Sequence, residues 1–127
     1  MGIRAIGNPP IYSTQAVSSN ASTSTLLAQI TGLVDGMYEA YVVLGCSTIG
    51  TFQLEQILST GLGDTALRTN GARGELGRVT IYTAADQTAE YLFGFSAQVD
   101  DSVRVRLGVA ITGGEDAAAK IRLERLA

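Results

Sequence analysis

The stretch that decides the fold is residues 91–111, which read YLFGFSAQVDDSVRVRLGVAI. Hydrophobic side chains alternate with other residues on both sides of its centre: Tyr91, Phe93, Phe95, Val103, Val105, Leu107, Val109 and Ile111. Such alternation puts every second side chain on one face of an extended strand. Residues 98–101, Gln-Val-Asp-Asp, have the composition of a turn. The sequence therefore predicts strands at 88–97 and 102–111 that pair as a hairpin, with the aromatic residues in the core.

Outward from this stretch, short segments rich in β-branched and aromatic residues are separated by Gly, Asp and Asn, a pattern typical of further strands. We expect these strands at residues 26–31, 37–45, 51–58 and 78–83. One more strand is expected from the N-terminal part of the chain.

Residues 115–127, EDAAAKIRLERLA, fit two patterns. Ala119, Leu123 and Leu126 follow helical spacing, with acidic residues first and basic residues later, whereas the segment from Ala119 to Leu123 also alternates as a strand does. Local propensity favours the helix. We nevertheless predict a strand at 119–125, because a sheet of seven other strands leaves a free edge and tertiary context overrides helix propensity.

About eight strands with turn signals at short intervals predict an all-β protein, an antiparallel β-sandwich and specifically a jelly roll. We expect residues 24–127 to form the β-sandwich domain and residues 1–23 to form an extended N-terminal arm, because consecutive prolines disfavour helix. The connection at 59–77 is long and rich in glycine, and loops of this length in compact domains are usually functional or ordered by a partner.

The composition excludes most familiar catalytic devices. The 127 residues include no His, no Trp and a single Cys, so a Ser-His-Asp triad, a His-liganded zinc and a CxxC redox pair all lack their parts. We expect that cysteine, Cys46, to be a small buried hydrophobe. The sequence predicts a protein that is not an enzyme, with no catalytic residues, no metal and no cofactor.

Acidic residues offer two further candidates for chemistry. Glu39 and Glu55 lie on predicted strands that can be neighbours, as a glycosidase pair requires, but a solvated face or an interface is the favoured interpretation. Asp100 and Asp101, taken with Asp86, lack the D-x-D-x-D-G spacing of a calcium loop, so we interpret them as turn residues.

Charge and hydropathy narrow the range of partners. Nine basic and twelve acidic residues give a net charge of −3, which provides no general attraction to the phosphate backbone of nucleic acids. No apolar window of about 18 residues is present, so we expect no membrane span. The N-terminus lacks the apolar core of an export signal, and we therefore expect synthesis in a cytoplasm.

Two arginines interrupt the apolar pattern of the predicted 102–111 strand. Arg104 and Arg106 lie on the face opposite Val103, Val105 and Leu107. One interpretation is a solvated surface. The other is that they meet carboxylates on another subunit, because the forked guanidinium group suits such pairing.

The order of the segments resembles small jelly-roll capsid decoration, or cement, proteins of tailed bacteriophages. The resemblance is carried by ITGLVDGMYEA at 30–40, GTFQLE at 50–55, AEYLF at 89–93 leading to DSVRVRL at 101–107, and IRLERL at 121–126. It implies a non-enzymatic virion protein, often trimeric, that is made in the host cytoplasm, sits on the outer capsid surface and joins neighbouring subunits of the major capsid protein.

The resemblance also implies that the arm and the sheet edges make the contacts, although it fixes no individual residue. From this sequence alone we expect interface residues in the arm and among the exposed arginines: Ile3, Arg4, Ile6, Pro9, Pro10, Ile11, Tyr12, Arg73, Arg104 and Arg106.

Self-association is expected as well. A small domain with 46% hydrophobic and 17% charged residues tends to leave apolar surface that a subunit interface covers, and we expect a homotrimer. The alternative function is a carbohydrate- or receptor-binding jelly-roll module of a phage tail or head fibre. The absence of Trp weakens that alternative, because sugar platforms rely on aromatic faces.

Overall fold

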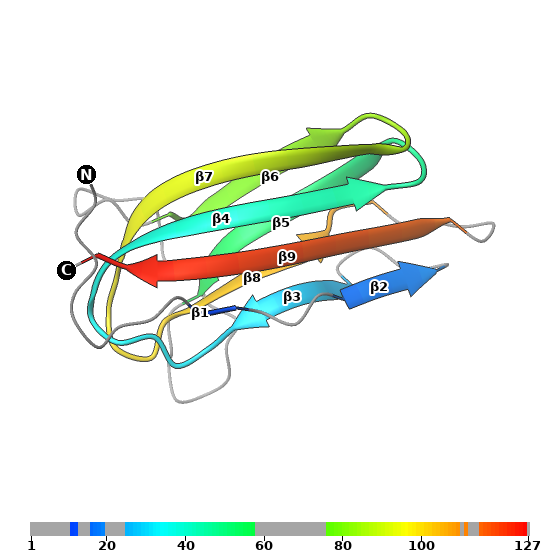
Figure 1. The fold of residues 1–127 in the computed structure, drawn as a ribbon. Coiled ribbons are helices and arrows are strands. Elements are labelled where there is room, and N and C mark those ends of the chain that lie inside the picture. The colour runs from blue at the N-terminus through cyan, green and yellow to red at the C-terminus, as the bar shows by residue number, and fades with distance from the viewer. Residues whose placement is uncertain are drawn as a thin grey trace.

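The computed structural model describes residues 11–12, 16–19, 25–57, 76–109, 111 and 115–126, the first two ranges as backbone strands only. These residues form two antiparallel sheets packed face to face (Figure 1), so the predicted all-β sandwich is confirmed. The strands are β1 (Ile11–Tyr12), β2 (Ala16–Ser19), β3 (Leu26–Ile30), β4 (Gly36–Cys46), β5 (Gly50–Ile57), β6 (Arg78–Thr83), β7 (Gln87–Ala97), β8 (Ser102–Leu107) and β9 (Asp116–Arg125). The described part of the chain has no helix that is long and apolar enough to cross a membrane.

The strand order shows which segments become neighbours. The five-stranded sheet runs β1-β9-β4-β7, and β2 also pairs with β9. The four-stranded sheet runs β3-β8-β5-β6. Every pairing is antiparallel. Sequence neighbours such as β4 and β5 therefore lie in different sheets, and each sheet is assembled from distant parts of the chain.

The core lies between the two sheets and is built by alternation. On β4 every second side chain points inward and is buried: Tyr38, Ala40, Val42, Leu44 and Cys46. The ring of Tyr38 stacks on the ring of Phe95 from β7, with 5.6 Å between the ring centroids. Cys46 is a free, buried cysteine, as predicted. Each large apolar side chain that is fully buried contributes roughly 1.5–3 kcal/mol, so the alternating strands are the main source of stability.

The predicted hairpin of residues 88–97 and 102–111 is wrong, although the two strands exist. β7 pairs with β4, whereas β8 pairs with β3 and β5 in the other sheet. The connection is an arch that crosses between the sheets. Phe95 and Val103 are buried from opposite sides of the core, which an arch permits and a hairpin within one sheet does not. Alternation identifies a strand's buried face but not its hydrogen-bonding partner.

The second strand of that prediction is also shorter than expected, because β8 ends at Leu107. The backbone N–H of Gly108 donates to the carbonyl oxygen of Thr51 at 2.7 Å, and a side-chain carbon at position 108 would lie 2.8 Å from the Thr51 methyl group. Val109 is consequently exposed instead of continuing the buried face. The buried row of β8 therefore stops at Leu107, next to the close contact between Gly108 and β5.

The predicted C-terminal strand is confirmed, but it does not occupy a free edge. β9 pairs with β4 along one side and with β1 and β2 along the other. Its buried residues, Ala117, Ala119, Ile121 and Leu123, alternate on the inner face. Hydrogen bonding on both sides and this apolar row outweigh the helical propensity of the segment.

Candidate functional site

The outer face of the four-stranded sheet carries a group of charged side chains centred on Glu55 of β5. The register places Glu55 directly opposite Arg104 of β8 on one side and Arg78 of β6 on the other. Arg106 lies two residues along β8 and reaches Glu55 diagonally, as long side chains on one sheet face can. We call this group the arginine cluster: Arg78, Arg104 and Arg106 around Glu55.

All three guanidinium groups donate hydrogen bonds to the carboxylate. Arg104 Nε donates to Oε1 of Glu55 at 2.9 Å. Arg106 binds both carboxylate oxygens, with Nε 2.7 Å from Oε1 and Nη2 2.8 Å from Oε2. Arg78 Nε donates to Oε2 at 2.7 Å. The two-pronged contact of Arg106 is the geometry in which arginine binds carboxylates most strongly.

The carboxylate is enclosed while the arginines stay partly in solvent. The Glu55 side chain is 0% exposed, whereas those of Arg104, Arg106 and Arg78 are 16%, 22% and 46% exposed. Burial by itself raises the pKa of Glu55, but the hydrogen bonds from Arg106, Arg104 and Arg78 outweigh it and lower the pKa from 4.5 to about 2. Glu55 is therefore ionised at neutral pH and holds the three arginines together.

The cluster leaves a net positive charge on this face. Three arginines and one glutamate give a surplus of two positive charges. The same face carries uncharged polar side chains, including Gln53, whose Oε1 accepts a hydrogen bond from Thr80 Oγ1 at 2.9 Å. Tyr82 is 68% exposed at the edge strand β6. Such a flat, hydrogen-bonding, cationic surface suits an anionic partner surface.

The outer face of the five-stranded sheet has the opposite sign. Charged side chains on the outward positions of β4, β7 and β9 are four acidic and two basic residues: Glu39, Glu90, Asp116, Glu124, Lys120 and Arg122. Arg122 lies 3.6 Å from Glu124. Tyr41 binds Glu90, and this hydrogen bond raises the pKa of the tyrosine. The two faces of the sandwich thus differ in charge.

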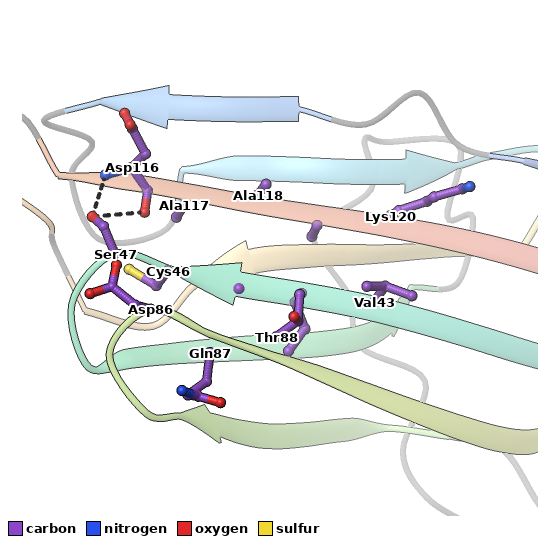
Figure 2. Close-up of a pocket in the computed structure, with 13 residues that line it drawn as sticks. Val43, Cys46, Ser47, Asp86, Gln87, Thr88, Asp116, Ala117, Ala118 and Lys120 are labelled. Atoms are coloured by element: carbon purple, nitrogen blue, oxygen red, sulfur yellow. Dashed lines mark hydrogen bonds between the residues drawn. The ribbon is translucent and has the colours of Figure 1, made fainter.

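This face also bears an open pocket of about 480 Å³ where β4 ends and β7 and β9 begin. Figure 2 shows polar side chains around it, among them Ser47, Asp86, Asp116 and Lys120. Ser47 Oγ accepts a hydrogen bond from the Asp116 backbone N–H at 2.8 Å. Several of the other lining residues have small side chains: Gly45, Ala117, Ala118 and Ala119.

The structure places only some of the predicted site residues. Arg104 and Arg106 lie in the cluster, bound to a carboxylate of their own chain. Of the arm, Ile11 and Tyr12 form β1, whose backbone pairs with Leu123 and Arg122. The remaining predicted interface residues lie outside the described residues: Ile3, Arg4, Ile6, Pro9, Pro10 and Arg73. Most of the long 59–77 connection lies outside them as well.

Sequence reasoning missed the role of Glu55 and did not select Arg78. Alternation could have placed both residues on the outer face of their strands. Glu55 lies between the buried Leu54 and Gln56, and Arg78 precedes the more buried Val79. The strand partners were not predictable from this signal. Glu39, considered with Glu55 as a carboxylate pair, lies on the outer face of the opposite sheet, so the two cannot act on one bond.

Comparison with known proteins identifies the class of fold. No family model matches the sequence, and no curated protein matches it. Among solved structures, one described as CBM4 structure and function aligns over 98% of this chain and 80% of its own, with 12% identity and a TM-score of 0.55. The CBM36-1 domain of a multidomain xylanase from the hindgut metagenome of Trinervitermes trinervoides aligns over 94% and 98%, with 11% identity and a TM-score of 0.53.

A viral structure is equally similar. A chain of deformed wing virus, a honeybee pathogen, aligns over 98% of this chain and 45% of its own, with 7% identity and a TM-score of 0.56. This chain thus spans less than half of the viral one. At these identities the likeness shows the fold alone: a jelly-roll β-sandwich of the kind shared by carbohydrate-binding modules and viral capsid proteins, with no single family within that class.

Proposed function

We propose that this protein is a non-enzymatic capsid decoration protein that binds the outer surface of a phage head and reinforces contacts between subunits of the major capsid protein. The observation that carries the proposal is the arginine cluster, a cationic, hydrogen-bonding patch on the flat outer face of the four-stranded sheet. A patch of this kind fits carboxylates on the surface of a larger protein assembly.

Glu55 makes the patch suitable for this role because it fixes the arginines before a partner arrives. Arg104 and Arg106 are already held by hydrogen bonds, so little side-chain freedom is lost when they bind. The surplus positive charge also speeds encounter with an acidic surface, more strongly at low salt. On a shell, each of many identical sites stabilises the assembled state by a modest free energy. This is roughly 2.7 kcal/mol when the free protein is at a hundred times its dissociation constant.

Single substitutions in the cluster test the docking face. Arg104→Ala and Arg106→Ala each leave Glu55 with two arginines, so both variants should fold, bind phage heads more weakly and show less salt dependence. Lys120→Ala is the matched control, since it removes one positive charge from the opposite face. Co-sedimentation with heads over a salt series measures the effect, and equal weakening in all three variants would remove the cluster as the docking face.

The reinforcing role has its own test. Heads with the protein bound at full occupancy should release DNA at higher temperature or pressure than heads without it, because binding to the assembled shell stabilises that shell. Equal release thresholds at full occupancy would leave the protein a display or adhesion role and reject reinforcement.

A second candidate function is saccharide or receptor binding by a module of a tail or head fibre. It is favoured by the polar pocket on the five-stranded sheet and by the structural likeness to carbohydrate-binding modules. The pocket is lined by no aromatic ring among the described residues, which is why we place it second. Glycan-array binding that is lost in Asp116→Ala and kept in Arg106→Ala would support it over the first.

A further inference from the structure

The outer face of the four-stranded sheet changes from charged to uncharged along its strands. The register of β8, β5 and β6 sets three rows of outward positions: Arg104, Glu55 and Arg78 in the first, Arg106, Gln53 and Thr80 in the second, and Gly108, Thr51 and Tyr82 in the third. Neighbouring rows lie about 6.6–6.8 Å apart, because each is two residues further along the strands. The arginine cluster occupies the first row and one end of the second, whereas the third row carries no charge.

Tyr82 lies in the third row with its side chain largely in solvent. It is 68% exposed. Its cross-strand neighbour is Thr51, and the next position in the row is Gly108, which has no side chain. A side-chain carbon at position 108 would lie 2.8 Å from the Thr51 methyl group, so a larger residue is disfavoured there. Two small neighbours across the sheet therefore give the tyrosine ring little to pack against within its row.

Two more exposed apolar side chains lie at the same end of the sheet. Ile49 comes just before β5 and is 72% exposed, and Val109 comes two residues after β8 ends and is 54% exposed. The start of β5 pairs with the end of β6 and lies beside the end of β8, so both residues are near Tyr82. We call Tyr82, Ile49 and Val109 the apolar rim. Exposed apolar side chains that gather beside polar ones mark an interaction site.

Charge decides which kind of surface suits this face. The arginine cluster carries a surplus of two positive charges, so the same face of a second copy is repelled. The outer face of the other sheet is acidic, but its acidic residues are interspersed with Lys120 and Arg122, and Arg122 lies 3.6 Å from Glu124. A second copy therefore offers less charge complementarity than a partner surface whose carboxylates have no basic neighbours.

We propose that Tyr82 is the apolar anchor of the docking face, and that the partner is a protein surface presenting carboxylates to the arginine cluster and an apolar side chain to the apolar rim. This inference rests on the proposed function and adds the part of the contact that salt does not weaken. The two parts lie about 12–14 Å apart between Cα atoms, because Tyr82 is two rows from Arg78, and one row and two strands from Arg106.

A tyrosine is well suited to this role. Its ring buries a large area at a low cost in conformational entropy, and tyrosine is enriched among the residues that dominate binding energy. Charged groups mainly speed the encounter of two surfaces, whereas contacts buried in the complex mainly slow its dissociation. The arginine cluster and Tyr82 thus contribute to different steps of binding.

Removing the ring tests the anchor. Tyr82→Ala should raise the dissociation constant for phage heads about 30-fold, equivalent to about 2 kcal/mol. The increase should be the same at every salt concentration because no charge is removed, whereas Arg106→Ala should reduce the salt dependence. Tyr82→Phe keeps the ring and should keep the affinity. Leu92→Ala is the matched control, since it removes a similarly exposed apolar side chain from the opposite sheet.

Folding and self-association are measured on the same variants. Tyr82→Thr removes the ring but keeps a β-branched side chain suited to a strand, so it should weaken binding as Tyr82→Ala does and unfold thermally like the unmodified protein. Without heads, light scattering should give both variants the mass of the unmodified protein. A smaller mass for both variants would identify a second copy as the occupant of the apolar rim and overturn the inference.

The remaining outcomes separate this inference from the proposed function. Weaker binding of Arg106→Ala together with unchanged binding of Tyr82→Ala would overturn the inference and leave the proposed function standing. Unchanged binding of both variants, or no binding of the unmodified protein to heads, would overturn both. A loss of salt dependence in Tyr82→Ala as large as that in Arg106→Ala would show that the tyrosine is not an apolar anchor.

Discussion

At the scale of single residues, Glu55 is a carboxylate held by three arginine side chains. It points to the outer face of its sheet, yet its side chain is fully enclosed by the arginines that bind it. Burying a carboxylate is unfavourable unless cations and hydrogen bonds compensate for lost water. Here three partners compensate, and the carboxylate in turn offsets the repulsion between three guanidinium groups on neighbouring strands.

This pairing predicts a specific dependence of stability on acid. The pKa of Glu55 is about 2 in the folded chain and near 4.5 when unfolded, so the unfolded state binds the proton more readily. The stabilisation is complete above pH 4.5 and is lost as pH falls toward 2. Urea unfolding between pH 5 and 2 should show this loss, with a smaller loss in Glu55→Gln. Identical acid profiles for both proteins would contradict the pairing.

Replacing the Glu55 carboxylate should lower the free energy of unfolding far more than replacing a glutamate on the opposite face. Glu55→Gln leaves three arginines without their counter-charge and should lower the free energy of unfolding by about 3–5 kcal/mol at pH 7. Glu39→Gln removes a glutamate from the opposite face, and a surface change of this kind should stay within about 0.5 kcal/mol. Chemical denaturation measures both, and similar losses for the two variants would count against a special role for Glu55.

At the scale of elements, the arch between β7 and β8 is held by a buried polar network. Oδ2 of Asp101 accepts hydrogen bonds from the Gln98 backbone N–H at 3.0 Å and from Gln56 Nε2 at 2.9 Å. The same Nε2 also donates to the Ser96 carbonyl, and Gln56 Oε1 accepts from the Leu76 backbone N–H. Gln56 therefore ties the arch to β5 and to the segment that enters β6.

The two neighbouring aspartates of this arch should respond differently to substitution. Asp101→Ala leaves the donors of Gln56 and Gln98 unsatisfied in a buried site, and should cost about 1–3 kcal/mol of stability. Asp100 has a positive φ of 66°, a conformation that glycine adopts freely, so Asp100→Gly should be nearly neutral. Thermal unfolding of the two variants distinguishes them. Equal losses at both positions would show that the network does not hold the arch.

The strands show which structural features the sequence patterns could predict. Sequence patterns located β3 to β7 to within one residue at each end, because burial of one face is recorded locally in every second residue. The hairpin prediction failed at the same residues, since β7 and β8 satisfy the alternation whether they pair with each other or cross between sheets. For β9, strand and helix patterns overlapped, and only its pairing with β4 on one side and with β1 and β2 on the other decides between them.

At the scale of the whole molecule, the sandwich has a cationic face on one sheet and an acidic face on the other. The sequence predicted that Arg104 and Arg106 face outward, but not that Glu55 and Arg78 meet them. The contact of Glu55 with these arginines depends on the position of β5 between β8 and β6. This is a long-range arrangement that no local sequence pattern indicates. The arginine cluster and the pocket therefore belong to opposite sheets of the sandwich.

The central position of β9 has a consequence for biosynthesis. Residues 116–125 are the hydrogen-bonding partner of β1, of β2 and of one side of β4, and they are synthesised after all three. A nascent chain still lacking those residues at the ribosome exit cannot close the five-stranded sheet, and it exposes an apolar face and open strand edges meanwhile. Ribosome-bound chains stalled before residue 116 should therefore be sensitive to protease and should bind chaperones. Chains that include β9 and have left the ribosome should become resistant to protease in one cooperative step.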